Sequence, residues 1–287
     1  MVRLLADGVD PRWLTLREGA DAAARAADLV DRVRAEVVKA RRGRQAIVVH
    51  DLGCGTGSML RWLAPQLPGP QRWVLHDRDT KVLAHAARNR VSAADATAVD
   101  VETRVDDVTG LAPGELRGAH LVTASALLDL LTAGELEHLA VRCLEPVCPV
   151  LLTLTVTGGA RLDPAHPLDA VLADAFDAHQ RRVARGGRLL GPDAGSFAAG
   201  LLAGPRTRLE LRPTPWQLGP DDGELVRQWL SGWLGAACRQ EPALAGEVPG
   251  YLRRRRRDLA EGRLRVTVRH EDLLVVPRAA APSAPAR

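Results

Sequence analysis

One short apolar run ends in an acid and is followed by three glycines on alternate positions. Such a segment is well suited to bind a ligand through its backbone. Segment 48–60 reads VVHDLGCGTGSML, with glycines at 53, 55 and 57 and Asp51 two positions before the first of them. Glycine lets the backbone approach a ligand closely and adopt positive φ angles. Where an apolar strand precedes such a turn and a helix follows it, the N-terminus of the helix presents free backbone N–H groups to the ligand. The segment therefore predicts a ligand cradle at the carboxyl edge of a parallel sheet.

The spacing of the glycines separates the two ligand classes that use this device, dinucleotides and S-adenosylmethionine. The dinucleotide pattern GxGxxG would place its third glycine at 58, where the chain has Ser58. Asp51 would also serve a diphosphate poorly, whereas a ligand with an ammonium and a sulfonium group tolerates a carboxylate. S-adenosylmethionine is favoured over a nicotinamide cofactor, and a purely structural glycine turn is the alternative.

Further acids follow the next two predicted strands. Asp77 stands about 20 residues beyond the last glycine, where a carboxylate can accept both ribose hydroxyls. Asp106 and Asp107 follow the third strand, and one of them could accept a hydrogen bond from the adenine amino group. The alternation of valine and threonine over 99–105 favours Asp107. Three acids at the ends of successive strands favour a ligand site over solvated strand ends.

Strands and helices alternate over the part of the chain that carries these residues. Apolar runs predict strands at 46–50, 73–75, 99–105, 121–124 and 149–156, and helices at 58–67, 80–88 and 127–144. This order predicts parallel βαβ units in a doubly wound α/β sheet. Elsewhere the patterns predict one helix over 13–38, a loop over 158–166, helices at 167–183, 221–238 and 251–259, a strand at 208–211 and a terminal strand or hairpin at 263–268 and 273–276.

These motifs resemble those of the class I S-adenosylmethionine-dependent methyltransferases. The matching pieces are DLGCGTG at 51–57, HD at 76–77, DDV at 106–108 and LVTASALLDLL at 121–131. Further pieces, among them WLTLREGADAAAR near the start and TPWQL at 214–218, are similar to a bacterial branch of that superfamily. The pattern departs at Ala126, where many members carry a polar residue.

The resemblance implies a Rossmann-like, mostly parallel sheet of seven strands with an N-terminal helical cap and an insert after the fifth strand. It implies an enzyme that uses S-adenosyl-L-methionine, releases S-adenosyl-L-homocysteine by in-line displacement and needs no metal. The cofactor-binding residues it implies are Asp51, Gly53, Cys54, Gly55, Gly57, Asp77, Arg78, Asp106, Asp107, Val108, Thr123 and Ser125.

The expected organisation divides the chain into three parts. Residues 1–45 form the helical cap, 46–278 the methyltransferase domain and 279–287 a disordered tail. Within the domain we expect a cofactor half at 46–157, a substrate-side insert at 158–204 and C-terminal helices and strands at 205–278.

Candidate catalytic and substrate residues come from the helices around the expected site. His179 shares an apolar helix face with Leu172 and Phe176, so it is either a catalytic base or a core histidine. Asp129 is a second catalytic candidate, or a first-turn acid. Arg17, Gln180 and Trp216 are candidates for substrate binding. The structural alternatives are a surface ion pair of Arg17 with Asp21 and a core position for Trp216.

The composition of the chain disfavours several classes of partner. The formal charge of +4 comes almost entirely from arginine, and aromatic residues make up 3% of the chain, which disfavours a nucleic-acid surface. The run of arginines at 253–257 is expected to be a solvated helix face. The four cysteines have no metal-binding spacing, and no apolar run is long enough to span a membrane. We therefore expect a cytoplasmic protein, a monomer or homodimer, that methylates a small molecule. The alternatives are an RNA or protein methyltransferase and a non-catalytic S-adenosylmethionine-binding module.

Overall fold

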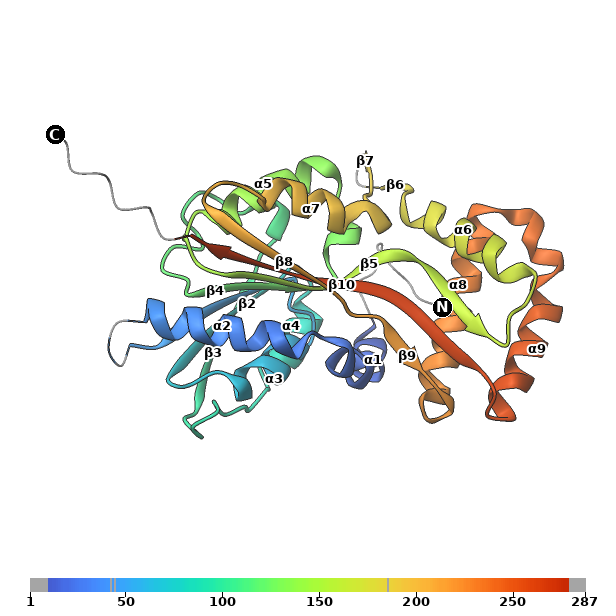
Figure 1. Cartoon of the computed structure of the whole chain (residues 1–287), viewed down its shortest axis with the longest axis horizontal. Helices are drawn as coiled ribbons and strands as arrows, with labels where there is room; N and C mark the ends of the chain where they lie inside the picture. Colours follow the sequence, from blue (N-terminus) through green and yellow to red (C-terminus); the bar gives the residue numbers. More distant parts are fainter. Residues whose placement is uncertain (1–9, 42, 44, 185, 279–287) are drawn as a thin grey trace.

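A mixed sheet runs through the molecule (Figure 1). The computed structural model describes residues 10–41, 43, 45–184 and 186–278. The strands lie in the order β3-β2-β1-β4-β5-β10-β8, and β9 pairs with β10. Their bounds are β1 Ile47–Leu52, β2 Gln71–Asp77, β3 Val99–Val105, β4 Leu121–Ser125, β5 Val150–Asp163, β8 Thr207–Pro213, β9 Trp216–Leu218 and β10 Arg265–Pro277. The first five strands pair in parallel, whereas β10 is antiparallel to β5, β8 and β9. The predicted doubly wound α/β fold is confirmed.

Helices cover both faces of the sheet. One face packs against α2 (Ala27–Ala40), α3 (Ser58–Leu63) and α4 (Thr80–Ala86), and the other against α5 (Ala133–Leu144) and α7 (Ala194–Leu202). Strand alternation supplies both cores: Leu274 of β10 enters the first and Leu273 the second. The carboxyl ends of the parallel strands are thereby held at one edge of a rigid, two-sided layer.

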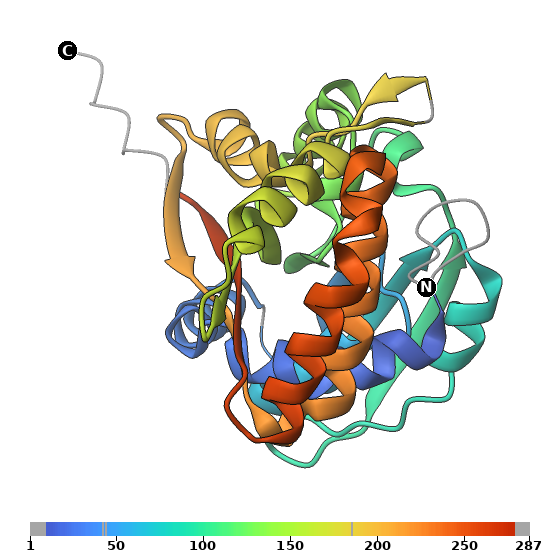
Figure 2. The same ribbon diagram turned by 90° about the vertical axis from the view of Figure 1, so that its right-hand side faces the viewer.

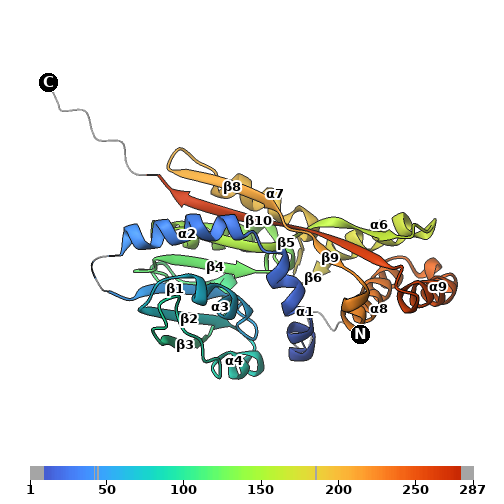
Figure 3. The ribbon, with the colours of Figure 1, turned by 60° about the horizontal axis from the view of Figure 1, so that its bottom comes forward.

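A second packed region lies beyond that edge. It contains α1 (Pro11–Ala24), α6 (Leu168–Gln180), α8 (Gly223–Gln240) and α9 (Val248–Ala260), packed around a third apolar core. β5 and β10 are long enough to run from the sheet into this region as one paired ribbon (Figure 1). Figure 2 shows α6, α8 and α9 from their outer side, and Figure 3 shows α1 between the parallel strands and α8. A small hairpin, β6 (Val183–Ala184) with β7 (Gly187–Arg188), follows α6.

The single helix predicted over 13–38 is wrong. The chain forms α1 and α2, separated at Arg25 and Ala26. The backbone N–H of Ala26 donates to Oδ2 of Asp272 at 2.9 Å instead of continuing the helical ladder. An acid from the far end of the chain therefore ends α1, which no local pattern reveals.

Three other sequence predictions need correction. The segment 158–166, expected as a loop, continues β5 to Asp163 because it pairs with β10. The helix expected over 127–144 begins at Ala133, because Thr132 and Glu135 form a capping box; a short turn, Leu128–Leu130, precedes it. The segments 263–268 and 273–276 belong to one strand, β10, whose pairing with β5 shifts register twice.

These corrections bear on the expected organisation. The boundary at 157/158 falls inside β5. Within the expected cap, α2 packs into the core of the sheet, whereas α1 belongs to the second region. Residues 1–9 of that cap and the tail at 279–287 lie outside the described residues.

The arginine run of α9 is only in part a solvated face. Arg255 is 1% exposed. Its side chain lies over the ring of Tyr251 and donates a hydrogen bond to Asp169. The other four arginines of the run are not buried. Among the described residues, none of the helices has the length and hydropathy needed to cross a membrane.

Candidate active site

The glycine loop between β1 and α3 has a conformation that requires glycine. Gly53, Gly55 and Gly57 have φ angles of 66°, 56° and 84°. The N–H of Gly55 donates to Oδ2 of Asp77 at 2.9 Å, which ties the loop to the end of β2. A Cβ on Gly57 would lie 2.5 Å from Nδ2 of Asn89. The loop is therefore held both by its own backbone geometry and by the neighbouring strand.

A cavity of about 200 Å³, here called cavity A, lies at this loop. Most of the residues predicted to bind the cofactor line it: Asp51, Gly53, Cys54, Gly55, Asp77, Arg78, Asp106, Asp107, Val108 and Ser125. Two do not. Gly57 is the N-cap of α3, and Thr123 is buried in β4 beneath Asp51. The ends of β1 to β4 thus meet at one cavity, as parallel pairing requires.

Asp51 is a buried carboxyl group at the floor of cavity A. It is 1% exposed; Oδ1 accepts a hydrogen bond from Thr123 at 2.7 Å, and Oδ2 has no partner among the described residues. Burial raises the pKa of Asp51 to about 7, against the opposing effect of the Thr123 hydrogen bond. A cationic group in the cavity would supply the missing partner and favour the ionised carboxylate.

Arg25, at the break between α1 and α2, lies behind the same wall of the cavity. It is 4% exposed and lies over the ring of Trp62, and its NH2 group donates to Ser58 and Ser125. Nε and NH1 have no partner among the described residues. Burial lowers the pKa of Arg25, whereas nearby Asp21 raises it. No local sequence pattern marks Arg25, because it lies at a break between two helices that a long-range contact creates.

The acids after β2 and β3 are held in different ways. Asp77 accepts from the backbone of Gly55 and Asp79. Asp106 receives a 2.8 Å hydrogen bond from Nδ1 of His76, a fully buried ring. Asp107 is exposed, and its Oδ1 accepts from Thr109. The expected preference for Asp107 rested on its register with a core-facing or rim-facing set of β3 side chains that includes Val105, and that side chain is 62% exposed.

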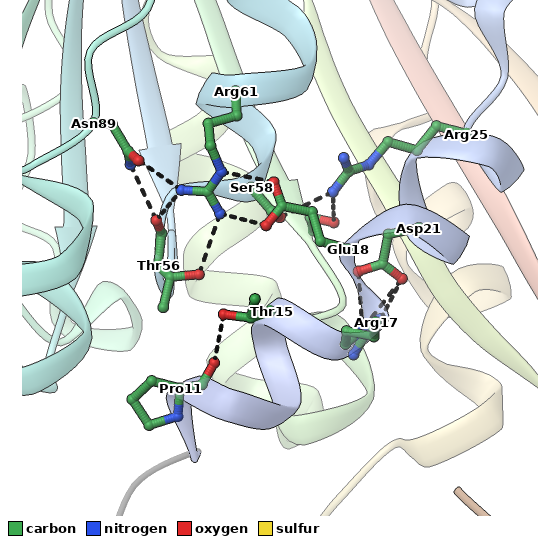
Figure 4. Close-up of polar contacts among 11 residues, drawn as sticks. Pro11, Thr15, Arg17, Glu18, Asp21, Arg25, Thr56, Ser58, Arg61 and Asn89 are labelled. Carbon is green, nitrogen blue, oxygen red and sulfur yellow. Dashed lines mark hydrogen bonds and ion pairs between the residues drawn. The ribbon is translucent and has the colours of Figure 1, made fainter. Parts of the chain in front are cut away.

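Polar contacts tie helix α1 to α3 and to the glycine loop (Figure 4). Arg61 of α3 makes two hydrogen bonds of 2.6 Å to Glu18 of α1 and also donates to the carbonyl of Thr56 in the glycine loop. Trp13 and Leu14 of α1 line the cavity. No sequence motif marks these contacts, since their helix meets the loop only in the tertiary structure.

A larger cavity of about 520 Å³, here called cavity B, lies between β5, β10, α6 and α8. All five residues proposed for catalysis or substrate binding line it: Arg17, Asp129, His179, Gln180 and Trp216. Trp229 and Trp233 of α8 are buried and also line this cavity. Residues far apart in the sequence therefore converge on a second site beside the first.

Burial shifts the pKa values of the acidic and basic groups of cavity B in opposite directions. Burial raises the pKa of Asp129 to about 6 and lowers that of His179 to about 4, with Arg182 and Arg239 adding to the second effect. Burial also lowers the pKa of His270 to about 3. Both histidines are therefore neutral at neutral pH.

Arg17 forms the ion pair with Asp21 that was the structural alternative for it, and it also lines cavity B. The ion pair is two-pronged, but it is largely buried, with side-chain exposures of 14% and 6%. Its guanidinium lies 5.0 Å from the centre of the Trp216 ring, and Nε1 of Trp216 donates to Asp21. The pair is thus part of the cavity wall and joins α1 to β9.

Cavities A and B adjoin each other. Trp13, Arg17, Ala126 and Leu130 line both. Ala126 has a φ angle of 51°, an uncommon value for a residue with a Cβ, and its N–H donates to Thr153 at the end of the β4–β5 pairing. The turn after β4 therefore lies at the boundary between the cavities.

Comparison with known proteins bears on the first of these cavities. Residues 49–147, about a third of the chain, match the family model described as a methyltransferase domain. This segment is similar to a methyltransferase domain, in line with the resemblance that its motifs carry. It contains the glycine loop and Asp51, Asp77 and Asp106, and the match supports an S-adenosylmethionine-dependent methyltransferase enzyme. No curated protein matches the chain.

Solved structures of similar fold include methyltransferases from several bacteria. One from Geobacter sulfurreducens, in complex with S-adenosyl-L-homocysteine, is 18% identical over 94% of this chain and 99% of that one, with a TM-score of 0.42. The cyclopropane synthase MmaA2 from Mycobacterium tuberculosis is 13% identical over 95% of both chains, with a TM-score of 0.47.

A third structure, from Listeria monocytogenes and assigned as an S-adenosylmethionine-dependent methyltransferase, has a TM-score of 0.29 at 18% identity. The alignment covers 42% of this chain and 53% of that one, so this chain spans about half its length. All three TM-scores lie below 0.5. Within the described residues, no group of three or more His, Cys, Asp or Glu side chains is placed to hold a metal ion.

Proposed function

We propose that this methyltransferase holds S-adenosylmethionine in cavity A and a small-molecule acceptor in cavity B. The observation that carries the proposal is the shared boundary of the two cavities at Ala126, with Trp13 and Leu130 beside it. A methyl transfer needs two reactants held in contact and shielded from water. Two adjoining cavities, one of them walled by buried aromatic side chains, meet that need.

The residues of cavity A fit this cofactor. The unpartnered Oδ2 of Asp51 suits the ammonium group of the methionine portion, and the bare backbone at Gly53 and Gly55 allows close approach. Asp77 would accept from the ribose, and we assign Asp106 ahead of Asp107 to the adenine amino group because His76 fixes its carboxylate. S-adenosylmethionine supplies an electrophilic methyl group on a sulfonium sulfur.

Asp129 is the candidate base that we place first. It lines cavity B next to Leu130, a boundary residue, and its pKa of about 6 suits proton acceptance near neutral pH. For a hydroxyl acceptor, the proton passes to this carboxylate, the new bond joins oxygen to the methyl carbon, and the electron pair of the broken S–CH₃ bond stays on sulfur. His179, with its lower pKa, is the weaker base of the two.

Calorimetric titration with S-adenosylmethionine, S-adenosylhomocysteine and NADH tests the cofactor assignment. We expect micromolar binding of the first two and none of NADH. Asp77→Asn should weaken both by about tenfold or more, since it removes a charged acceptor. Asp100→Asn, an exposed acid on β3, is the matched control and should bind as the wild type does. If neither adenosyl compound binds, or both variants bind equally well, the proposed function is wrong.

A further inference from the structure

Cavity B gathers an unusual share of the aromatic side chains. The chain has nine Phe, Trp and Tyr residues, and five of them line this cavity: Trp13, Phe176, Trp216, Trp229 and Trp233. Trp229 and Trp233 stack with their ring centres 5.2 Å apart. The ring centres of Trp13 and Trp216 are 6.5 Å apart. Flat aromatic walls favour a flat apolar ligand, because stacked and edge-on ring contacts add to the burial of apolar area.

Three buried polar atoms around this cavity have no partner among the described residues. They are Nε1 of Trp233, Nδ1 of His270 and Oε1 of Gln180. Trp233 is 1% exposed and His270 5%. A buried polar group without a hydrogen bond is costly, so such atoms mark places where a ligand supplies the missing partner. Since the indole N–H is only a donor, at least one ligand atom here must accept.

Two arginines at the end of α6 and on α8 add positive charge. Arg182 and Arg239 line the cavity, and within the described part of the chain neither has an ion-pair partner. Arg182 donates one hydrogen bond, to the carbonyl of His179. Burial lowers the pKa of Arg182, and the charge of Arg239 lowers it further. Two like charges beside a half-buried space favour an anion between them.

The charge of that anion is limited by the acids of the same cavity. Asp129 and Asp177 also line it, and the carboxylate of Asp177 already accepts from the backbone N–H of Gly159 at 2.9 Å. A dianionic phosphate would meet repulsion from these groups, whereas a single carboxylate matches the planar fork of an arginine.

We infer that the acceptor is an aromatic carboxylate whose ring packs against the tryptophans and whose anionic group is bound by Arg182 and Arg239. This inference rests on the proposed function only for the role of the ligand as acceptor. Binding to cavity B is a separate property, which can be measured without methyl transfer.

Titration of tryptophan fluorescence tests the inference directly, because four tryptophans line the cavity. The probes are 4-hydroxybenzoate, 4-hydroxyphenylacetate and 4-hydroxycinnamate, each compared with its neutral amide, with and without saturating S-adenosylhomocysteine. We expect at least one acid to bind about tenfold more tightly than its amide. The double change Arg182→Gln and Arg239→Gln should abolish that preference. Arg227→Gln, an exposed arginine on α8 outside the cavity lining, should retain it.

The outcomes separate the two proposals. If no acid in the series binds more tightly than its amide, or if the double variant keeps the preference, the inference is wrong whatever the calorimetry with S-adenosylhomocysteine shows. If the acids bind and lose their preference in the double variant while S-adenosylhomocysteine fails to bind, cavity B is an aromatic-acid site and the proposed methyl transfer is wrong.

Discussion

Arg61 of α3 and Glu18 of α1 are joined by two hydrogen bonds of 2.6 Å. The same guanidinium donates to the Thr56 carbonyl and to Asn89, so the glycine loop, the segment after α4 and the N-terminal helix share one anchor (Figure 4). Opening α1 requires this contact to break. We therefore expect the pair to couple the exposure of cavity A to the docking of α1.

Glu18→Gln should loosen that docking. The two side chains are 27% and 29% exposed, so the global free energy of unfolding should fall by less than about 1 kcal/mol. Local opening of α1 should increase several-fold, and S-adenosylhomocysteine should dissociate faster. Hydrogen exchange of the amides in 11–24 and stopped-flow release measure these effects. Glu36→Gln, which removes a weaker pair with Lys39 on α2, is the control; equal effects of both changes would contradict the coupling.

The affinity for S-adenosylhomocysteine should rise with pH through the titration of Asp51. Its pKa of about 7 means that the group becomes an anion, and so a partner for the ligand ammonium, only as pH approaches and passes neutrality. Calorimetry between about pH 5 and pH 8 should show this rise in the wild type. Asp51→Asn should bind about tenfold more weakly at the upper end and with a flatter profile. Parallel profiles for the two proteins would rule out Asp51 as the titrating group.

The same carboxyl group should affect the stability of the ligand-free protein in the opposite direction. Burial raises its folded pKa above the ordinary value of 3.8, so its stabilising contribution is complete below that value and is lost as pH rises to about 7. The free energy of unfolding of Asp51→Asn, relative to wild type, should therefore increase between these two pH values and stay level above them. Urea denaturation across this range measures the difference. A relative stability that falls with pH would show that burial does not dominate.

Gly57→Ala should disturb the glycine loop. A residue with a Cβ is strained at a φ of 84°, and the new Cβ would lie 2.5 Å from Asn89 Nδ2. We expect a loss of about 1–3 kcal/mol in the free energy of unfolding and weaker S-adenosylhomocysteine binding. Gly19→Ala, in the middle of α1 where an added Cβ would meet no atom within 4 Å, should instead stabilise by up to about 1 kcal/mol. Chemical denaturation of the pair checks both signs, and similar effects would contradict the steric explanation.

His76 should act as a positioning residue for Asp106. A carboxylate only accepts, so Nδ1 of His76 carries the proton, and its Nε2 accepts from Nδ1 of His50 at 2.9 Å. Burial lowers the pKa of both histidines, that of His50 to about 4, so both rings are neutral at neutral pH.

His76→Phe keeps a buried ring but removes the donor. It should reduce the preference for S-adenosylhomocysteine over S-inosylhomocysteine, which lacks the exocyclic amino group, by several-fold. Competitive calorimetry measures this ratio. The exposed His85→Phe on α4 is the control. An unchanged ratio with lower affinity for both ligands would indicate that His76 has only a structural role.

The sequence alone determined the glycine loop and the meeting of the strand-end acids. Positive φ at Gly53, Gly55 and Gly57 is a local requirement that residue type reveals. Parallel strands end at one edge of a sheet, so acids that follow successive strands must meet there, and Asp51, Asp77 and Asp106 do line one cavity. These relations depend on strand order and on contacts within βαβ units. The periodicity of apolar residues predicts the strands and helices that form those units.

Only the tertiary structure decided how α1 and cavity B are built. The break that turns Arg25 inward depends on Asp272, which lies 246 residues beyond Ala26 in the chain. Trp13, Asp129 and His270 come together from α1, the turn after β4 and β10, although each alone fits an ordinary core or helix position. Long-range packing of this kind leaves no periodic pattern in the sequence. The contacts of each of these side chains depend on residues that are distant in the sequence and meet only in the folded protein.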